Sequence, residues 1–264
     1  MAEQEVAVET AGVSLGGNLA TPDAPAGAVV FAHGTGSSRH SPRNRMVASV
    51  LQESGFATLL FDLLTEDEER IDRITARQRF DIDLLTGRLS GAVTWLGGRE
   101  ETRELPVGLF GASTGAAAAL RTAADHPDLV GSVVSRGGRP DLAGAALTRV
   151  RAPVLLVVGG ADRQVLALNE IAAQRLGGPH EVYVVPYATH LFEEPGTLDQ
   201  VAVAAADWFA RTWSRTSTAR GIARSEPRPT RPHGKLSGPS ALGDAIGFHL
   251  LAVPGTASGQ RYGT

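Results

Sequence analysis

Short apolar runs that end in glycine-rich or polar turns recur along the first four fifths of the chain. The run from Ala28 to Ala32 is continuously apolar, which is typical of a strand buried on both faces of a sheet. Near the N-terminus, Glu5 to Thr10 alternates polar and apolar residues and Val13 to Ala20 follows a short turn, which predicts an antiparallel edge pair. Five further strands are predicted at Phe56 to Phe61, Val107 to Phe110, Leu129 to Ser135, Pro153 to Val158 and Glu181 to Val185.

Helical periodicity fills most of the intervals between these strands. Helices are predicted over Met46 to Ser54, about Thr75 to Leu96, the segment after Ser113 up to Asp125, Val165 to Leu176 and Leu198 to Trp213, with an acidic loop from Asp62 to Arg70. Strands that alternate with helices indicate βαβ units, so we expect an α/β fold with a mostly parallel eight-stranded sheet and helices on both faces. Only the 17 residues from Arg136 to Ala152 separate two of the strands, which is too few for a lid domain.

The composition changes after Trp213, where arginine, proline, serine, threonine and glycine dominate. Residues 214–264 carry seven basic and two acidic side chains, and apolar positions are sparse until Ala245 to Val253. We therefore expect two parts, a folded domain over residues 1–213 and a basic tail over residues 214–264 that is disordered.

The remaining composition narrows the class of protein. Apolar residues make up 42% of the 264, enough to bury a sizeable core, and the chain has no cysteine, which excludes disulfides and thiolate chemistry. The N-terminus is acidic and no run of 18 apolar residues occurs, so we expect a cytoplasmic protein without a membrane partner. No metal-ligand spacing appears, and we expect no metal, no cofactor and no nucleic-acid partner.

The sequence G-A-S-T-G at residues 111–115 carries the clearest chemical signal. A serine between two glycines, at a strand-to-helix turn, is the arrangement that exposes a nucleophile in the G-x-S-x-G pattern. The N-terminus of the following helix favours negative charge that develops beside Ser113. A five-residue pattern also arises by chance in a chain with 31 glycines, so its context decides.

Asp162 and His190 supply that context. Each follows a predicted strand, and the chain order Ser113, Asp162, His190 is the order of a serine triad on an α/β sheet. In such a triad the histidine takes the serine proton and the carboxylate orients the histidine. Asp162 also suits the cap of the next helix, and Asp62 and Asp141 are competing acids, although Asp62 precedes the serine and Asp141 lies one strand early.

A second glycine-rich turn, His33 to Ser38, follows the strand at Ala28 to Ala32. The backbone N–H groups of Thr35 and Thr114 are the candidate donors of an oxyanion hole. A phosphate-cradling loop is the alternative for this turn, but the lysine of that motif is missing. Four arginines at strand ends are candidates to bind an anionic group of the substrate or to form a solvated face: Arg39, Arg43, Arg136 and Arg139.

Four segments together resemble the α/β-hydrolase superfamily and, within it, the small dienelactone-hydrolase-like group that is sometimes fused to phosphoribosyltransferase domains. These segments are residues 31–45, 111–115, 158–169 and 188–196, and the resemblance covers about Glu5 to Trp213. It implies an α/β-hydrolase fold and esterase chemistry. Dienelactone hydrolases proper use a cysteine nucleophile, whereas the equivalent position here is Ser113, which leaves the dienelactone substrate open.

Two functions follow from these observations. The first is a lidless serine hydrolase that cleaves a small ester, lactone or thioester through an acyl-Ser113 intermediate. The second is a non-catalytic binding or scaffold module that keeps the fold and uses its basic tail, because a fold alone does not determine function.

Overall fold

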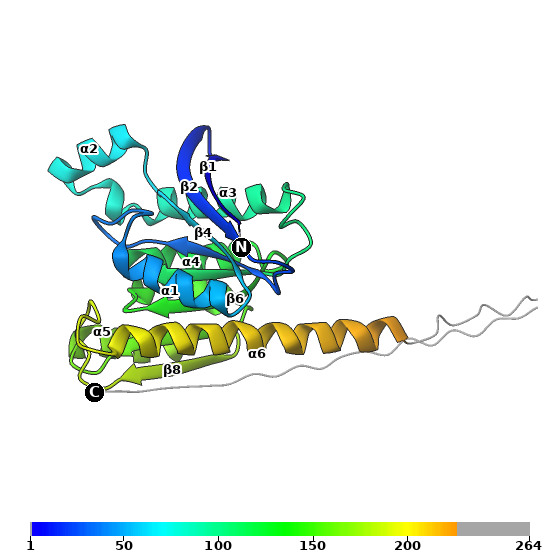
Figure 1. Ribbon diagram of the computed structural model, residues 1–264. Helices are drawn as coiled ribbons and strands as arrows, with labels where there is room; N and C mark the ends of the chain where they lie inside the picture. Colours follow the sequence, from blue (N-terminus) through cyan, green and yellow to red (C-terminus); the bar gives the residue numbers. More distant parts are fainter. Residues whose placement is uncertain (1, 226–264) are drawn as a thin grey trace, which may run out of the picture. The chain divides into compact units, whose positions relative to one another are not determined.

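The computed structural model describes residues 2–225 and contains one eight-stranded sheet (Figure 1). The strand order is β1-β2-β4-β3-β5-β6-β7-β8. The first two strands pair antiparallel with each other and β2 pairs antiparallel with β4, while all other neighbours are parallel. The predicted α/β-hydrolase fold with a mostly parallel eight-stranded sheet is therefore confirmed.

The strands agree closely with the apolar runs of the sequence. They are β1 (Ala2–Thr10), β2 (Val13–Thr21), β3 (Ala28–Ala32), β4 (Ala57–Phe61), β5 (Val107–Ala112), β6 (Val130–Arg136), β7 (Val154–Gly159) and β8 (His180–Val185). Every residue of β3, β4, β5 and β7 is buried, as expected for central strands covered on both faces. By contrast, β8 is an edge strand in which only Val185 is buried.

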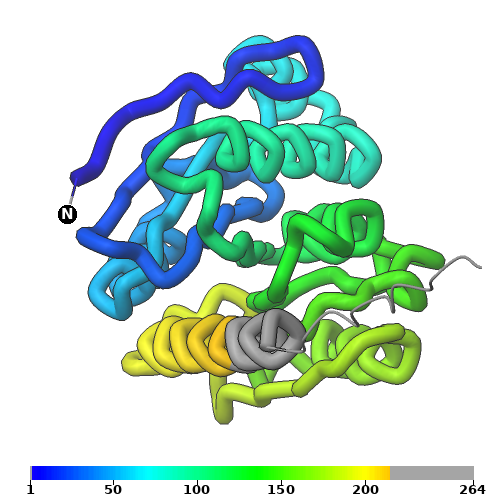
Figure 2. Tube along the Cα trace, turned by 90° about the vertical axis from the view of Figure 1, so that its right-hand side faces the viewer, coloured from blue at the N-terminus to red at the C-terminus, as the bar shows by residue number. Residues whose placement is uncertain are grey.

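Helices cover both faces of the sheet (Figure 2). They are α1 (Pro42–Glu53), α2 (Glu66–Thr75), α3 (Ile82–Gly97), α4 (Thr114–Asp125), α5 (Arg163–Ala173) and α6 (Thr197–Ser225). On one face α1 packs beside α6, and on the other face α3 packs beside α4. Each pair buries its apolar side in a separate core, so the sheet lies between two layers of helices.

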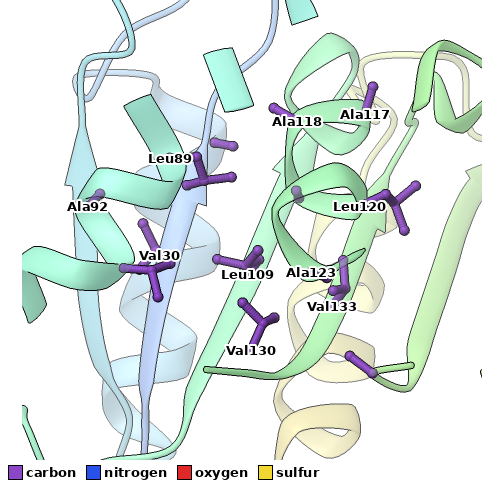
Figure 3. Packing of buried hydrophobic residues seen from close by; sticks show 14 of the residues in the cluster. Val30, Leu89, Ala92, Leu109, Ala117, Ala118, Leu120, Ala123, Val130 and Val133 are labelled. Atoms are coloured by element: carbon purple, nitrogen blue, oxygen red, sulfur yellow. The ribbon is translucent and has the colours of Figure 1, made fainter. Parts of the chain in front are cut away.

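The core under α3 and α4 is built from small and branched side chains (Figure 3). Leu89 of α3 lies near Val30 of the sheet, and Ala123 of α4 lies near Val133. Leu109 and Leu120 belong to the same buried cluster. The alanine-rich sequence of α4 lets that helix approach the strands closely. This close packing fixes the first turn of α4, which follows Ser113 directly.

The segment between β4 and α3 differs from the prediction. An acidic loop over Asp62 to Arg70 and one long helix from about Thr75 were expected, but the structure has a separate helix, α2, and a 3₁₀ turn at Gln78–Phe80. Thr65 begins α2 with a capping box, because its hydroxyl accepts from Glu68 N–H and the Glu68 carboxylate accepts from Thr65 N–H. Ala76, in a left-handed conformation, ends the helix.

The segment between β6 and β7 holds a 3₁₀ helix, Pro140–Arg149, and no lid domain, as predicted. Helix α6 continues past Trp213 to Ser225, twelve residues beyond the predicted domain end. Phe56, Phe209 and Trp213 form a ring cluster that attaches α6 to the sheet. The rest of the predicted tail, residues 226–264, lies outside the described residues, as does the segment Ala245 to Val253.

Among the described helices, none has both the length and the apolar character that crossing a bilayer requires.

Candidate active site

Ser113 occupies the turn between β5 and α4 and has backbone angles that a non-glycine residue rarely adopts. Its φ is 51° and its ψ is −121°. A Cβ on Gly111 would collide with Ala116 of α4, and a Cβ on Gly115 would collide with the carbonyl oxygen of Ala32 at the end of β3. Glycine is therefore needed at both positions to let strand and helix meet around Ser113. Strain of this kind is frequent at functional residues.

The C-terminal end of β6 holds the Ser113 backbone in place. The Ser113 N–H donates to the Arg136 carbonyl oxygen at 3.2 Å, and the Arg139 N–H donates to the Ser113 carbonyl oxygen at 3.0 Å. Between these two arginines, Gly137 lies against the histidine loop, because a Cβ on Gly137 would be 3.7 Å from Cε1 of His190. One short segment thus contacts both the serine turn and His190.

Asp162 and His190 are joined by a short hydrogen bond. The His190 Nδ1–H donates to Asp162 Oδ2 at 2.7 Å, and the Asp162 side chain is only 15% exposed. The other carboxylate oxygen, Oδ1, accepts from the Val165 N–H at 3.4 Å and caps α5. Both interpretations of Asp162 are therefore compatible, since one oxygen caps a helix and the other orients the imidazole.

The two competing acids are held by arginines instead. Asp62 accepts from the Arg39 backbone N–H at 2.8 Å and from its guanidinium at 2.6 Å. Asp141 makes a two-pronged pair with Arg139, at 2.8 and 2.7 Å. Neither carboxylate has a hydrogen bond to His190 among the described residues, so Asp162 is the acid that the geometry favours.

The glycine-rich turn after β3 lies against Ser113. A Cβ on Gly34 would be 2.9 Å from the Ser113 Cβ, and the hydroxyls of Thr35 and Thr114 are 3.1 Å apart. The structure thus brings the two candidate oxyanion residues together, one on each side of the serine turn. A cavity of about 110 Å³ adjoins both threonines and has a mixed lining that includes Leu63, Leu64, Leu85 and Arg79.

The ring of His33 holds this glycine-rich turn through two hydrogen bonds. Its Nδ1–H donates to the Gly34 carbonyl oxygen and its Nε2 accepts from the Leu63 N–H, both at 3.0 Å. A neutral imidazole with the proton on Nδ1 satisfies both bonds, whereas protonation of Nε2 would break the second. Burial lowers the pKa of His33, although the Gly34 carbonyl and the Asp62 and Glu69 carboxylates raise it in part.

The burial of His33 predicts that the folded chain becomes less stable in acid. Because the folded pKa of His33 lies below its unfolded value, the unfolded chain binds a proton that the folded chain does not. The free energy of unfolding should therefore fall as the pH drops below about 6.5, by at most about 1.4 kcal/mol per pH unit from this group. Melting temperatures measured from pH 8 to pH 5 should fall more steeply for the wild type than for His33→Gln.

His180→Gln is the matched control, because His180 is exposed at the start of β8. It should retain the wild-type slope. Equal slopes for the wild type and His33→Gln would show that the unfolding free energy does not depend on the titration of His33.

The four candidate arginines have different surroundings. Arg39 pairs with Asp62 and with Glu5, Arg43 pairs with Glu193 at 3.2 Å, and Arg139 pairs with Asp141. Arg136 has no carboxylate partner among the described residues. It is buried beside Phe192, and its Nη2 lies 3.4 Å from Oδ1 of Asn44.

Sequence reasoning overlooked two residues of the site. Gly137 lies against His190 and has a φ of 50°, and its only signal was its place in a glycine pair after a strand. Asn44, 2% exposed in the first turn of α1, lies within the segment 31–45 that carries the resemblance, but nothing singled it out there. Within the described part of the chain, no three histidine or acidic side chains are grouped as a metal ion requires.

Comparison with known proteins identifies the family of the chain. Residues 15–218 match the model of the dienelactone hydrolase family. The chain belongs to the dienelactone hydrolase family. A dienelactone hydrolase from Anabaena variabilis, known from a crystal structure, is 55% identical to it, with a TM-score of 0.79 over 80% of this chain and 98% of that one.

Two further proteins show how far the similarity extends. Est1E from Butyrivibrio proteoclasticus shares the fold, with a TM-score of 0.67 over 80% of this chain and 99% of that one, but only 14% of its residues are identical. A Mycobacterium tuberculosis protein named "Putative phosphoribosyl transferase" is 58% identical over 207 residues, which are 78% of this chain and 46% of that protein. This chain therefore matches less than half the length of that relative.

Proposed function

We propose that the chain is a serine hydrolase that cleaves a small ester, lactone or thioester through an acyl-Ser113 intermediate. Membership of the dienelactone hydrolase family supports hydrolase chemistry. The observation that carries the serine mechanism is the 2.7 Å bond between His190 and Asp162, together with the strained turn of Ser113. The segment from Arg136 to Arg139 lies against both His190 and that turn.

In the first half of the proposed reaction, His190 takes the proton of the Ser113 hydroxyl through Nε2. The serine oxygen attacks the carbonyl carbon of the substrate, and the carbonyl π electrons move onto its oxygen. Asp162 stabilises the imidazolium that forms, since its carboxylate already accepts from Nδ1–H. His190 then gives the proton to the leaving alcohol, thiol or ring oxygen as its bond to the acyl carbon breaks.

In the second half of the reaction, water hydrolyses the acyl-enzyme, and His190 again acts first as a base and then as an acid. His190 takes a proton from water, the hydroxide attacks the acyl carbon, and Ser113 leaves with the proton that His190 returns. In both halves the developing oxyanion is placed between the N–H groups of Thr35 and Thr114. These groups are preorganised by the hydroxyl contact of the two threonines and by the bonds of His33.

The proposal favours a small substrate. Thr35 and Thr114, the proposed oxyanion donors, line a cavity of about 110 Å³ that a short acyl or alcohol group would fit. The partner is thus a small-molecule ester. We also propose that the enzyme works in the cytoplasm, because a chain without cysteine suits a reducing compartment.

Covalent labelling tests the mechanism directly. A fluorophosphonate should add one label per chain, and peptide mapping should find that label on Ser113. Short acyl esters of 4-nitrophenol should protect against labelling while they turn over. A wild-type protein that neither labels nor hydrolyses any short ester would contradict the proposal and favour a non-catalytic binding module.

A further inference from the structure

Arg136 is a buried cation without a counter-charge. Two arginines, Arg88 and Arg136, are buried among the described residues. The Nη2 of Arg88 lies 2.8 Å from the Glu68 carboxylate. Arg136 is 8% exposed, and its buried Nε has no hydrogen-bond acceptor. Its one hydrogen bond is long, 3.4 Å from Nη2 to Oδ1 of Asn44. The chain thus supplies a guanidinium whose donors are largely unused.

Burial makes this arrangement unfavourable for the free protein. Burial, and then the charge of nearby Arg43, lower the pKa of Arg136 to about 10, so the guanidinium still carries its charge near neutral pH. The centroid of the Phe192 ring lies 6.0 Å from the guanidinium carbon, and this contact offsets only a small part of the cost of burying the charge. A buried charge with so little compensation in the free protein is typical of a group that waits for a ligand.

The surroundings of Arg136 add positive potential from a second element. Asn44 belongs to the first turn of α1, a twelve-residue helix that begins after Ser41, and helix N-termini attract anions. Arg43 lies in the same turn. Its only carboxylate partner among the described residues is Glu193, whose side chain is 63% exposed, so solvent screens that pair.

The backbone links this positive region to the proposed nucleophile. The carbonyl oxygen of Arg136 accepts from the Ser113 N–H, and Phe192 follows His190 by two residues in the same loop. An anionic group held by Arg136 would therefore belong to the molecule whose ester bond lies at Ser113.

We propose that Arg136, Arg43 and the first turn of α1 form a subsite for a dianionic phosphate group carried by the ester substrate. This inference rests on the proposed hydrolase function and refines it, because it names phosphorylated esters or thioesters as the substrate class. A phosphate offers three acceptor oxygens and up to two negative charges to these donors, whereas a carboxylate offers two oxygens and one charge.

Three matched acyl esters of 4-nitrophenol, whose acyl chains end in a phosphate, a carboxylate or a methyl group, test the subsite. The wild type should hydrolyse the phosphate ester with the highest kcat/KM. Arg136→Gln should lower the ratio of kcat/KM for the phosphate ester to kcat/KM for the methyl ester on the order of 100-fold, the size expected when a charged hydrogen-bond donor is lost. Arg136→Lys should fall between the two, because it keeps the charge and loses the planar fork.

Inorganic phosphate gives a readout that needs no turnover. Calorimetry should detect its binding to the wild type and to Arg211→Gln, which alters an exposed arginine of α6 paired with Glu181, but not to Arg136→Gln. Arg136→Gln should melt no lower than the wild type, since it removes an unpaired buried charge.

Each contrary result overturns a distinct part of the inference. Preference for the carboxylate ester would overturn the choice of phosphate. Equal loss on all three esters would make Arg136 structural. Phosphate binding that depends on Arg136 in a protein without esterase activity would keep the subsite and refute the proposed hydrolase.

Discussion

Replacing Ser113 with alanine should lower kcat for a short ester on the order of 10⁶-fold, the size of loss seen when the nucleophile of a serine triad is removed. The residual rate comes from the oxyanion donors and from substrate binding, which the substitution leaves in place. The fold should survive, because alanine has the same Cβ as serine and adds no further strain at a φ of 51°. Initial rates on a 4-nitrophenyl ester, together with the melting temperature, measure both effects.

Ser113→Cys is the matched control for this loss. The chain has no cysteine, so the substitution creates a single thiol that iodoacetamide can label. A cysteine thiolate is itself a nucleophile, and we therefore expect partial activity that iodoacetamide abolishes. Wild-type activity in Ser113→Ala would show that another residue attacks the ester.

Replacing Asp162 with asparagine should lower kcat/KM by about 10⁴-fold without loss of the fold. Asparagine is as good a helix cap as aspartate, so the bond to the Val165 N–H and the start of α5 should be kept. The amide removes the negative charge that stabilises the imidazolium and permits the wrong tautomer of His190. The substitution thus separates the two roles of this side chain, and rates with melting curves report on each.

Asp141→Asn is the comparison. Asp141 pairs with Arg139 and has no contact with His190, so its loss should change the rate less than about threefold. If Asp141→Asn abolished activity and Asp162→Asn did not, the bond seen between Asp162 and His190 would serve the helix and the loop rather than the reaction.

Apolar runs predicted the sheet well because buried parallel strands need apolar side chains on both faces. All five residues from Ala28 to Ala32 are buried, and the strand matches its predicted range. The segment from Asp62 to Leu96 was predicted less well. Only Asp72 of α2 is buried, so that helix leaves no apolar stripe in the sequence, and capping by Thr65 and Glu68 determines where it begins.

The candidate site, too, was predicted only in part. Chain order on strand ends was enough to pair Asp162 with His190, because parallel strands bring their carboxyl ends to one edge. It was not enough to separate Arg136 from the other three arginines. The partners of Arg39 and Arg43, such as Glu193 for Arg43, are distant in sequence, and only the folded chain brings them together.

The position of β8 at the edge of the sheet affects how the protein loses its proposed activity. His190 is carried by the loop after this strand, whose residues from His180 to Val184 are exposed and which has a neighbour on one side only. Ser113, in contrast, follows the fully buried β5. Edge strands open locally at a lower free energy than central ones. Partial opening of β8 would thus separate base from nucleophile while most of the domain stays folded, so we expect heat inactivation to precede global unfolding.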